Sequence, residues 1–252
     1  DNKTGDTAQI VNNFFALNRP NATGTSHVIY MYQPKNVNFS HNNCLNTAGA
    51  TLSSSGTAMY VYTSSSTYTG LSFYNNNFQS KKSGTMAVWY NISTSSTWFA
   101  QYNNYIASYV GAHAGFGYTT IAALASSTGK NVGAKNMDPM YDSNADLHIN
   151  NIKLMKAGKG IGITTDIDND SRDASTPTIG AHEIDPEIEV VKITPVTLKC
   201  GPKTTKHYVS VSVINNGDID LVDVPMELQL NGGTIVHDTI RSTLAKGATT
   251  VF

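Results

Sequence analysis

Short apolar runs return at a nearly constant interval along the first half of the chain. The runs at 28–32, 58–62 and 86–90 are bounded by Gly, Ser and Thr, which is typical of β-strands. A second phrase, two asparagines followed by an apolar residue, is in phase with them. Its four copies begin at Asn12, Asn42, Asn76 and Asn103. Recurrence at an interval of about 20–50 residues indicates stacked repeats, so the pattern predicts a coiled β-solenoid.

Equivalent side chains of such a solenoid lie above one another, because parallel strands stack about 4.8 Å apart. The strands expected here are 9–15, 28–32, 37–39, 58–62, 71–73, 86–90 and 98–101. The first asparagines are expected to form one ladder of amide hydrogen bonds. The second asparagines form the neighbouring ladder: Asn13, Asn43, Asn77 and Asn104. The apolar residues after them are expected to stack inside: Phe14, Cys44, Phe78 and Tyr105.

Beyond residue 110 this rhythm stops. Thr120 and its neighbour can cap a short helix over 121–127, which Gly129 then ends. An extended segment is expected at 147–154. Terminal repeats must differ from internal ones to end a stack. We therefore assign 1–110 to parallel β-helix coils and 111–185 to the terminal coil and cap.

The last part of the chain, 186–252, changes to strict alternation of apolar and polar residues. Val209, Val211 and Val213 share one face of a predicted strand, and Asn-Gly pairs supply tight turns. The pattern predicts an Ig-like β-sandwich with fewer than the usual seven strands. The fold class expected for the chain is all-β, a right-handed parallel β-helix followed by this sandwich. We expect the sandwich to be truncated and the chain to be a segment of a longer protein.

Composition narrows the classes of function. Charged residues make up 14% of the chain, against roughly 25% in average globular proteins, and the net charge is −1. Basic residues are scattered, which argues against nucleic acid as a partner. No apolar run is long enough to insert into a membrane. Cys44 and Cys200 fall in different predicted domains and are not expected to pair.

Two motifs near the predicted cap resemble a known family. Asp166-Ile167-Asp168-Asn169-Asp170-Ser171-Arg172, followed by Ile179-Gly180-Ala181-His182-Glu183, resembles the D-x-D-G-D-x-R … D-I-G-A-x-E ending of secreted parallel β-helix proteins of Bacteroidetes. These choice-of-anchor proteins share the pectate-lyase-like fold. Asn169 and Thr178 depart from the family's Gly and Asp. The resemblance covers about residues 8–185 and implies an extracellular, cell-surface protein.

The segment Val211-Ser212-Val213-Ile214-Asn215-Asn216-Gly217 is similar to the V-x-V-x-N-x-G motif of CARDB-type Ig-like modules, which are related to bacterial adhesion. Together the two resemblances imply a long chain exported by a type IX route. Its partners would be other domains of the same chain, polysaccharide or cell-surface proteins.

Catalytic residues are not predicted. Glycoside hydrolysis needs a pair of carboxylates, yet before Ala145 the acids beyond Lys3 are Asp6, Asp138 and Asp142, none of them in a repeating strand. We therefore expect a non-catalytic rigid stalk or adhesin. Two alternatives stay open: a carbohydrate-binding module, or the tail of a polysaccharide lyase or hydrolase whose active site lies upstream.

Two further groups of residues are candidate sites. Asp166, Asp168 and Asp170 alternate as in a calcium loop, so calcium is the one cofactor considered, although the EF-hand Gly and Glu are missing. The alternative is a structural lock in which Arg172 pairs with Glu183 or an aspartate.

The apolar runs 28–32, 58–62 and 86–90 contain two alternating tyrosine columns, and one of these columns must face outward. The residues proposed to contact carbohydrate are Tyr32, Tyr62, Trp89 and Tyr90, with Tyr30 and Tyr60 in the alternate column. An exposed aromatic stripe of this kind binds carbohydrate or partners. The competing interpretation is that the rings pack against loops.

Overall fold

The computed structural model describes residues 6–19, 25–47, 56–63, 68–195 and 209–252. They belong to two compact units, Asp1–Glu183 and Ile184–Phe252, which are described separately. The regular secondary structure of the described residues is mainly β-strand, with a single α-helix, which confirms the all-β class. No helix in the described part of the chain is long and apolar enough to cross a membrane.

The chain of the first unit supplies strands to three sheets in rotation. The first sheet contains β1 (Ala8–Val11), β4 (Val37–Ser40), β7 (Leu71–Tyr74) and β10 (Trp98–Gln101). The second contains β2 (Phe14–Leu17), β5 (Asn43–Asn46), β8 (Asn77–Ser80) and β11 (Asn104–Ile106). The third contains β3 (Ser26–Tyr32), β6 (Gly56–Tyr62), β9 (Met86–Asn91), β12 (Tyr109–His113) and β13 (Phe116–Tyr118).

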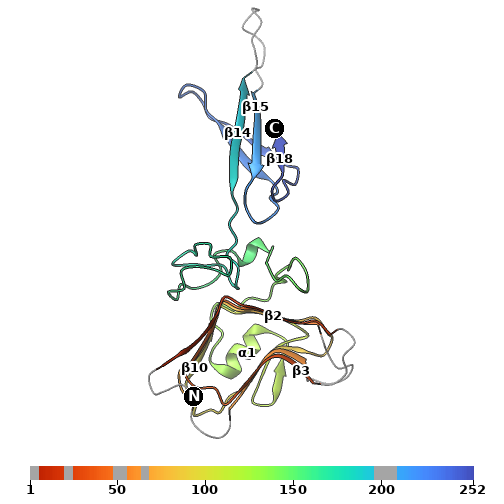
Figure 1. The fold of residues 1–252 in the computed structure, drawn as a ribbon, viewed down its shortest axis with the longest axis vertical. Helices are drawn as coiled ribbons and strands as arrows, with labels where there is room; N and C mark the ends of the chain where they lie inside the picture. Colours follow the sequence, from red (N-terminus) through yellow and green to blue (C-terminus); the bar gives the residue numbers. More distant parts are fainter. Residues whose placement is uncertain (1–5, 20–24, 48–55, 64–67, 196–208) are drawn as a thin grey trace, which may run out of the picture. The chain divides into compact units, whose positions relative to one another are not determined.

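Neighbouring strands pair in parallel throughout these sheets, except that β13 is antiparallel to β12. In Figure 1, β10, β2 and β3 lie on three sides of a common interior. Apolar side chains of all three sheets fill this interior, among them the fully buried Phe39, Phe73 and Phe78. The parallel strands of the described residues carry no acidic side chain.

The corner between the first and second sheets has the same form in every turn of the chain. Its first residue is left-handed, with φ between 53° and 55°: Asn12, His41, Asn75 and Tyr102. Its second residue is always an asparagine: Asn13, Asn42, Asn76 and Asn103. Left-handed backbone is costly for most residues and cheapest for Gly, Asn and Asp, which favours Asn12 and Asn75 at the first corner position.

These second corner residues form a continuous ladder. The Oδ1 atom of Asn42 accepts from the backbone N–H and the side-chain amide of Asn13, at 3.0 and 2.9 Å. Asn76 accepts in the same way from Asn42 at 3.0 and 3.1 Å, and Asn103 accepts from Asn76 at 2.9 Å for both bonds. The side-chain amide of Asn76 also donates to the Phe39 carbonyl at 2.9 Å. Each internal amide is thus satisfied by the turns on either side.

The alignment expected from the sequence is wrong by one residue in the first turn. Asn13 belongs to the ladder of Asn42, not to that of Asn43. Phe14 pairs with Asn43, so Phe15, rather than Phe14, stacks above Cys44 inside. The predicted strand 9–15 is likewise broken at this corner into β1 and β2. The cause is the left-handed residue, which is an asparagine in the first turn but a histidine in the second.

The remaining asparagines form a second ladder on the outer face of the second sheet. Asn77 Nδ2 donates to Asn43 Oδ1 at 2.8 Å, and Asn104 Nδ2 donates to Asn77 Oδ1 at 3.0 Å. The segment 137–181 covers this face, because the same side chains donate to the carbonyls of Leu147, Ile179 and Met137 at 2.7–2.9 Å. Strands β5 and β8 are consequently buried on both faces.

The only α-helix among the described residues is α1 (Ile121–Thr128), as predicted. Thr120 accepts from the Ala123 N–H, and Gly129 ends the helix with a left-handed φ of 66°. After α1 the chain continues the stack through parallel bridges from Gln101 to Val132 and from Asn104 to Lys135. The extended segment predicted at 147–154 is instead interrupted by a 3-10 turn, η1 (Ile152–Leu154).

The second unit contains two antiparallel sheets. One consists of β14 (Ile188–Pro195), β15 (Val209–Asn215) and β18 (Thr249–Val251), and the other of β16 (Val224–Leu228) and β17 (Val236–Ile240). Val213, Ile240 and Leu244 form its buried core.

The buried Asn215 ties the loops of this unit together. Its Nδ2 donates to the carbonyls of Ile219 and Leu244 at 2.7 and 3.0 Å, and its Oδ1 accepts from the Gly217 N–H at 3.0 Å. A buried amide with every group paired fixes the loops it joins. This explains an asparagine at that point of the alternating apolar strand.

Candidate functional site

Two groups of side chains outside the core merit description: an aromatic face on the third sheet and a cluster of charged residues at 142–183. Of the residues proposed to contact carbohydrate, Tyr32 and Tyr62 are paired in register. Trp89 lies in the neighbouring column with Tyr60. Tyr30 completes that column. The face therefore contains both columns that the sequence offered as alternatives, because tyrosines two residues apart point the same way.

Tyr90 does not belong to this face. It pairs with Val61 and is fully buried, so the expected column Tyr32–Tyr62–Tyr90 is wrong at its third member. Asn91 takes the position next to Tyr62. A shift of one residue moves every side chain to the other face, and this register turns Tyr90 and Val88 toward the core. The phenol of Tyr90 lies 3.0 Å from that of Tyr105 inside.

The rings of the aromatic face stack on one another along the sheet. The ring centroids of Tyr30 and Tyr60 are 5.2 Å apart, those of Tyr60 and Trp89 4.9 Å, and those of Tyr32 and Tyr62 5.5 Å. Such stacked pairs contribute about 0.5–1.5 kcal/mol each beyond the area they bury. Stacking covers the ring faces in the middle of the columns. Tyr30 and Tyr32 lie in β3, the strand at the edge of the sheet, and are 53% and 62% exposed.

Asp166 organises the charged cluster. Its Oδ1 accepts the backbone N–H groups of Asp168 and Asp170 at 2.8 and 2.9 Å, and its Oδ2 accepts that of Glu183 at 2.8 Å. The alternation of aspartates thus closes a loop around one buried carboxylate. One carboxylate oxygen of Asp166 and one of Asp168 lie within 4.8 Å of each other and of a His182 ring nitrogen, so these three side chains could hold a metal ion. Asp170 is outside this group.

Arg172 and Glu183 form a buried ion pair at 2.9 Å. The guanidinium also donates to the carbonyls of Gly180 and Ala181 at 3.0 and 2.7 Å, and to Asn12 Oδ1 at 3.0 Å. Burial lowers the pKa of Arg172 and raises the pKa of Glu183, so desolvation outweighs their mutual attraction. The pair therefore fixes the position of the segment against the first corner and adds little net electrostatic stability.

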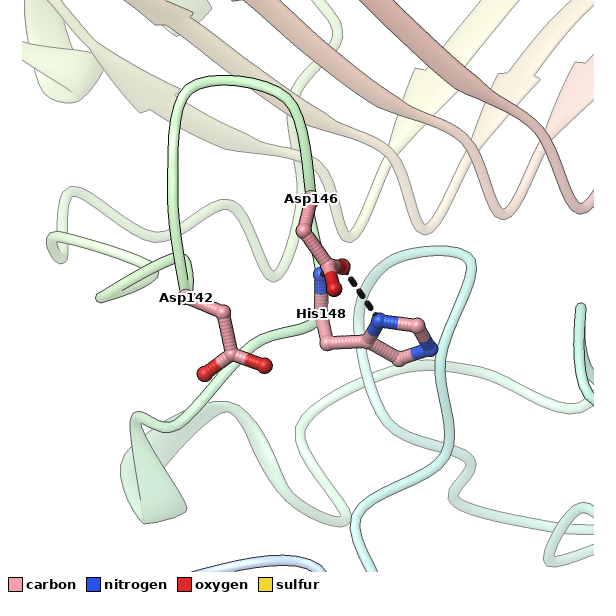
Figure 2. A group of neighbouring side chains, drawn as sticks. All are labelled: Asp142, Asp146 and His148. Atoms are coloured by element: carbon pink, nitrogen blue, oxygen red, sulfur yellow. Dashed lines mark hydrogen bonds and ion pairs between the residues drawn. The ribbon is translucent and has the colours of Figure 1, made fainter.

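His148 connects two loops of the cluster. Its Nδ1 lies 2.5 Å from Asp146 Oδ1 and its Nε2 lies 2.9 Å from Asp168 Oδ2. Figure 2 shows the Asp146 carboxylate facing the imidazole. Asp142 has a carboxylate oxygen within 4.8 Å of an Asp146 oxygen and of a ring nitrogen of His148, and its carboxylate accepts from Asn150 Nδ2 at 2.7 Å (Figure 2). Burial alone would lower the pKa of His148, but the hydrogen bonds to Asp146 and Asp168 raise it overall.

Sequence reasoning missed the histidines of this cluster. His148 and His182 are 34 residues apart, and their spacing carries no ligand pattern. Only the fold brings their ring centroids to within 4.9 Å, at an interplanar angle of 79°.

Comparisons of the chain with protein-family models, with curated proteins and with solved structures found no match.

Proposed function

We propose that this chain is a rigid, non-catalytic segment of a large secreted cell-surface protein, acting as a stalk or adhesin. In this proposal the first unit is a right-handed parallel β-helix of the pectate-lyase-like kind, and the second is an Ig-like, CARDB-like sandwich. The observation that carries the proposal is the unbroken asparagine ladder from Asn13 to Asn103.

The ladder supports a mechanical role because it repeats in every turn and binds each turn to the next. Asn42, Asn76 and Asn103 are fully buried, and their amides donate and accept along the stack. Breaking one turn leaves several buried polar groups without partners, and each such group costs about 1–3 kcal/mol. The aromatic columns add a second set of contacts between the same turns. A stack held in this way resists local opening and therefore proteolysis.

The strands offer little for catalysis in comparison. The described parallel strands carry no carboxylate, whereas hydrolysis of a glycosidic bond needs two of them. The proposal includes export by a type IX route and attachment at a cell surface. Both rest on the resemblance of residues 166–183 to secreted parallel β-helix proteins and of residues 211–217 to CARDB-type modules.

The test is the mass and location of the native polypeptide, detected with an antibody against residues 186–252. We expect a surface-exposed species many times heavier than the 27.1 kDa of this chain. A compact, freely secreted species close to that mass would refute the stalk and favour a separate binding module.

A second candidate function, carbohydrate binding, is favoured by the exposure of Tyr30 and Tyr32 at the edge of the aromatic face. A sugar ring stacks on an exposed aromatic ring, and Tyr32, at 62% exposed, is the more accessible of the two. We expect Tyr32→Ala to abolish retention of the chain on a polysaccharide column. Phe99→Ala removes a ring that is 45% exposed on the first sheet and serves as the matched control. Equal retention of both variants would exclude this face as the contact.

A further inference from the structure

Two histidines and two aspartates converge where the loop around 146–148 meets the loop 166–170. Asp166, Asp168 and His182 offer donor atoms that lie within 4.8 Å of one another. His148 joins them from the other loop, with Nε2 at 2.9 Å from Asp168 Oδ2 and its ring against that of His182. Three ligand side chains from two segments thus face one small region, and His148 borders it from a third segment.

The spacing of the three grouped atoms fits a shared metal ion. Zinc binds imidazole nitrogen and carboxylate oxygen at about 2.0–2.2 Å in tetrahedral geometry, so two of its ligand atoms lie roughly 3.3–3.6 Å apart. The ligand atoms of Asp166, Asp168 and His182 lie within 4.8 Å of one another, so small movements would bring them to this spacing. A water molecule would fill the fourth position of the tetrahedron.

The side chains that hold these ligands in position are also in place. His148 Nδ1 faces Asp146 (Figure 2), and its Nε2 lies 2.9 Å from Asp168 Oδ2. Carboxylates that bind a metal are commonly held by a hydrogen bond of this kind. Asp166 accepts the backbone N–H groups of Asp168 and of Glu183, the neighbour of His182. One carboxylate therefore positions the segments that carry the other two ligands.

Burial and charge favour a cation at this point. Asp166 and His182 are 3% and 4% exposed, whereas the side chains of His148 and Asp168 are 31% and 43% exposed and open the region to solvent. Three carboxylates, those of Asp146, Asp166 and Asp168, surround the two imidazoles. The nearby Arg172 forms its ion pair with Glu183.

We propose that Asp166, Asp168 and His182 form a binding site for a divalent transition-metal ion such as Zn²⁺, with His148 holding the Asp168 carboxylate in position. Mixed imidazole and carboxylate donors suit zinc, whereas calcium takes six to eight oxygen ligands. Binding would tie loop 166–170 to the segment that carries His182.

The test is isothermal titration of the intact, metal-free chain with zinc chloride, together with thermal unfolding at each metal concentration. We expect one ion per chain and a higher melting temperature. Asp168→Asn and His182→Gln should each weaken binding by at least about tenfold, and Asp146→Asn by about tenfold because Asp146 holds the His148 ring against Asp168. His237→Gln alters a histidine of the second unit whose side chain is 70% exposed, and should leave zinc binding unchanged.

Asp168→Asn changes a partly exposed side chain and is expected to fold, which circular dichroism without metal would establish. Absence of saturable zinc binding at one ion per chain would overturn the proposal. Equal affinity in Asp168→Asn, His182→Gln and the unaltered chain would overturn it as well. Calcium chloride in place of zinc should give no saturable heat, and tight calcium binding without zinc binding would replace this site by an oxygen-ligand site.

Discussion

His41 provides a direct test of the corner geometry, because it is a titratable residue in a fully buried corner position. Its Nδ1 donates to the Gly180 carbonyl at 3.2 Å, and its Nε2 accepts from Asn75 Nδ2 at 2.9 Å, so the ring is neutral. Burial, with a smaller contribution from the Arg172 charge, lowers the pKa of His41 to about 3. Acid should therefore unfold the first unit through this residue.

The magnitude follows from the difference between the folded and unfolded pKa values. The unfolded chain takes up a proton near the ordinary value of 6.5 and the folded chain near 3. Between these values the unfolded state holds more protons, so the contribution to stability is complete above pH 6.5 and is lost as the pH falls toward 3. One pKa unit is worth about 1.4 kcal/mol, so acidification from pH 7 to pH 5 removes about 2 kcal/mol.

The matched variant is His41→Asn, because Asn12 and Asn75 occupy the same left-handed position in neighbouring turns. Urea unfolding followed by tryptophan fluorescence reports on the first unit, since Trp89 and Trp98 both lie in it. Other groups titrate equally in both proteins and cancel in the comparison. We expect the unaltered chain to lose about 2 kcal/mol relative to His41→Asn between pH 7 and pH 5. An unchanged difference would show that His41 is not buried as a neutral ring.

Four substitutions test the other contacts, each by urea unfolding at pH 7. Asn76→Ala removes a middle amide of the ladder and should cost about 3 kcal/mol or more, whereas Asn13→Ala, at its end, should cost about half as much; equal losses would contradict a continuous ladder. Arg172→Lys keeps the charge but cannot reach the same acceptors, so it should lower the free energy of unfolding by about 2 kcal/mol or more. A much smaller loss would show that the several hydrogen bonds of the guanidinium are dispensable. Gly180→Ala, at φ 120°, places a Cβ atom 2.4 Å from two asparagine side chains. It should lower stability by about 2–4 kcal/mol, and a neutral result would refute this close approach.

Local signals predicted the parts of the fold that depend on local chemistry. Thr120 and Gly129 bound α1 through their own side chain and backbone, and the alternation at Val209–Val213 follows from one buried face. Register was not predictable in this way. The left-handed corner residue is asparagine, histidine or tyrosine, so no single residue type marks where each corner begins.

Long-range contacts account for the rest of what the sequence did not reveal. Asn43 reaches the Leu147 carbonyl across 104 residues, and this contact places the segment along the side of the second sheet. The meeting of His148 with Asp168 depends on that placement. The alternation of Asp166, Asp168 and Asp170 did indicate an organised loop. The sequence did not indicate that the Asp166 carboxylate also accepts the backbone N–H of Glu183, which ties this loop to the segment around 183.

The invariant corner also determines where this scaffold tolerates change. Two residues always separate the first sheet from the second, as at 12–13 and 75–76, because the amide ladder passes through them. The connections from the second sheet to the third vary widely in length: 18–25, 47–55, 81–85 and 107–108. Added loop length costs little, since doubling a flexible loop adds only about 0.6 kcal/mol. Neighbouring strands of a sheet lie about 4.8 Å apart, so foreign peptides grafted into these connections would be anchored at multiples of that distance. The unit could therefore present several copies of a ligand at fixed spacing to a multivalent partner.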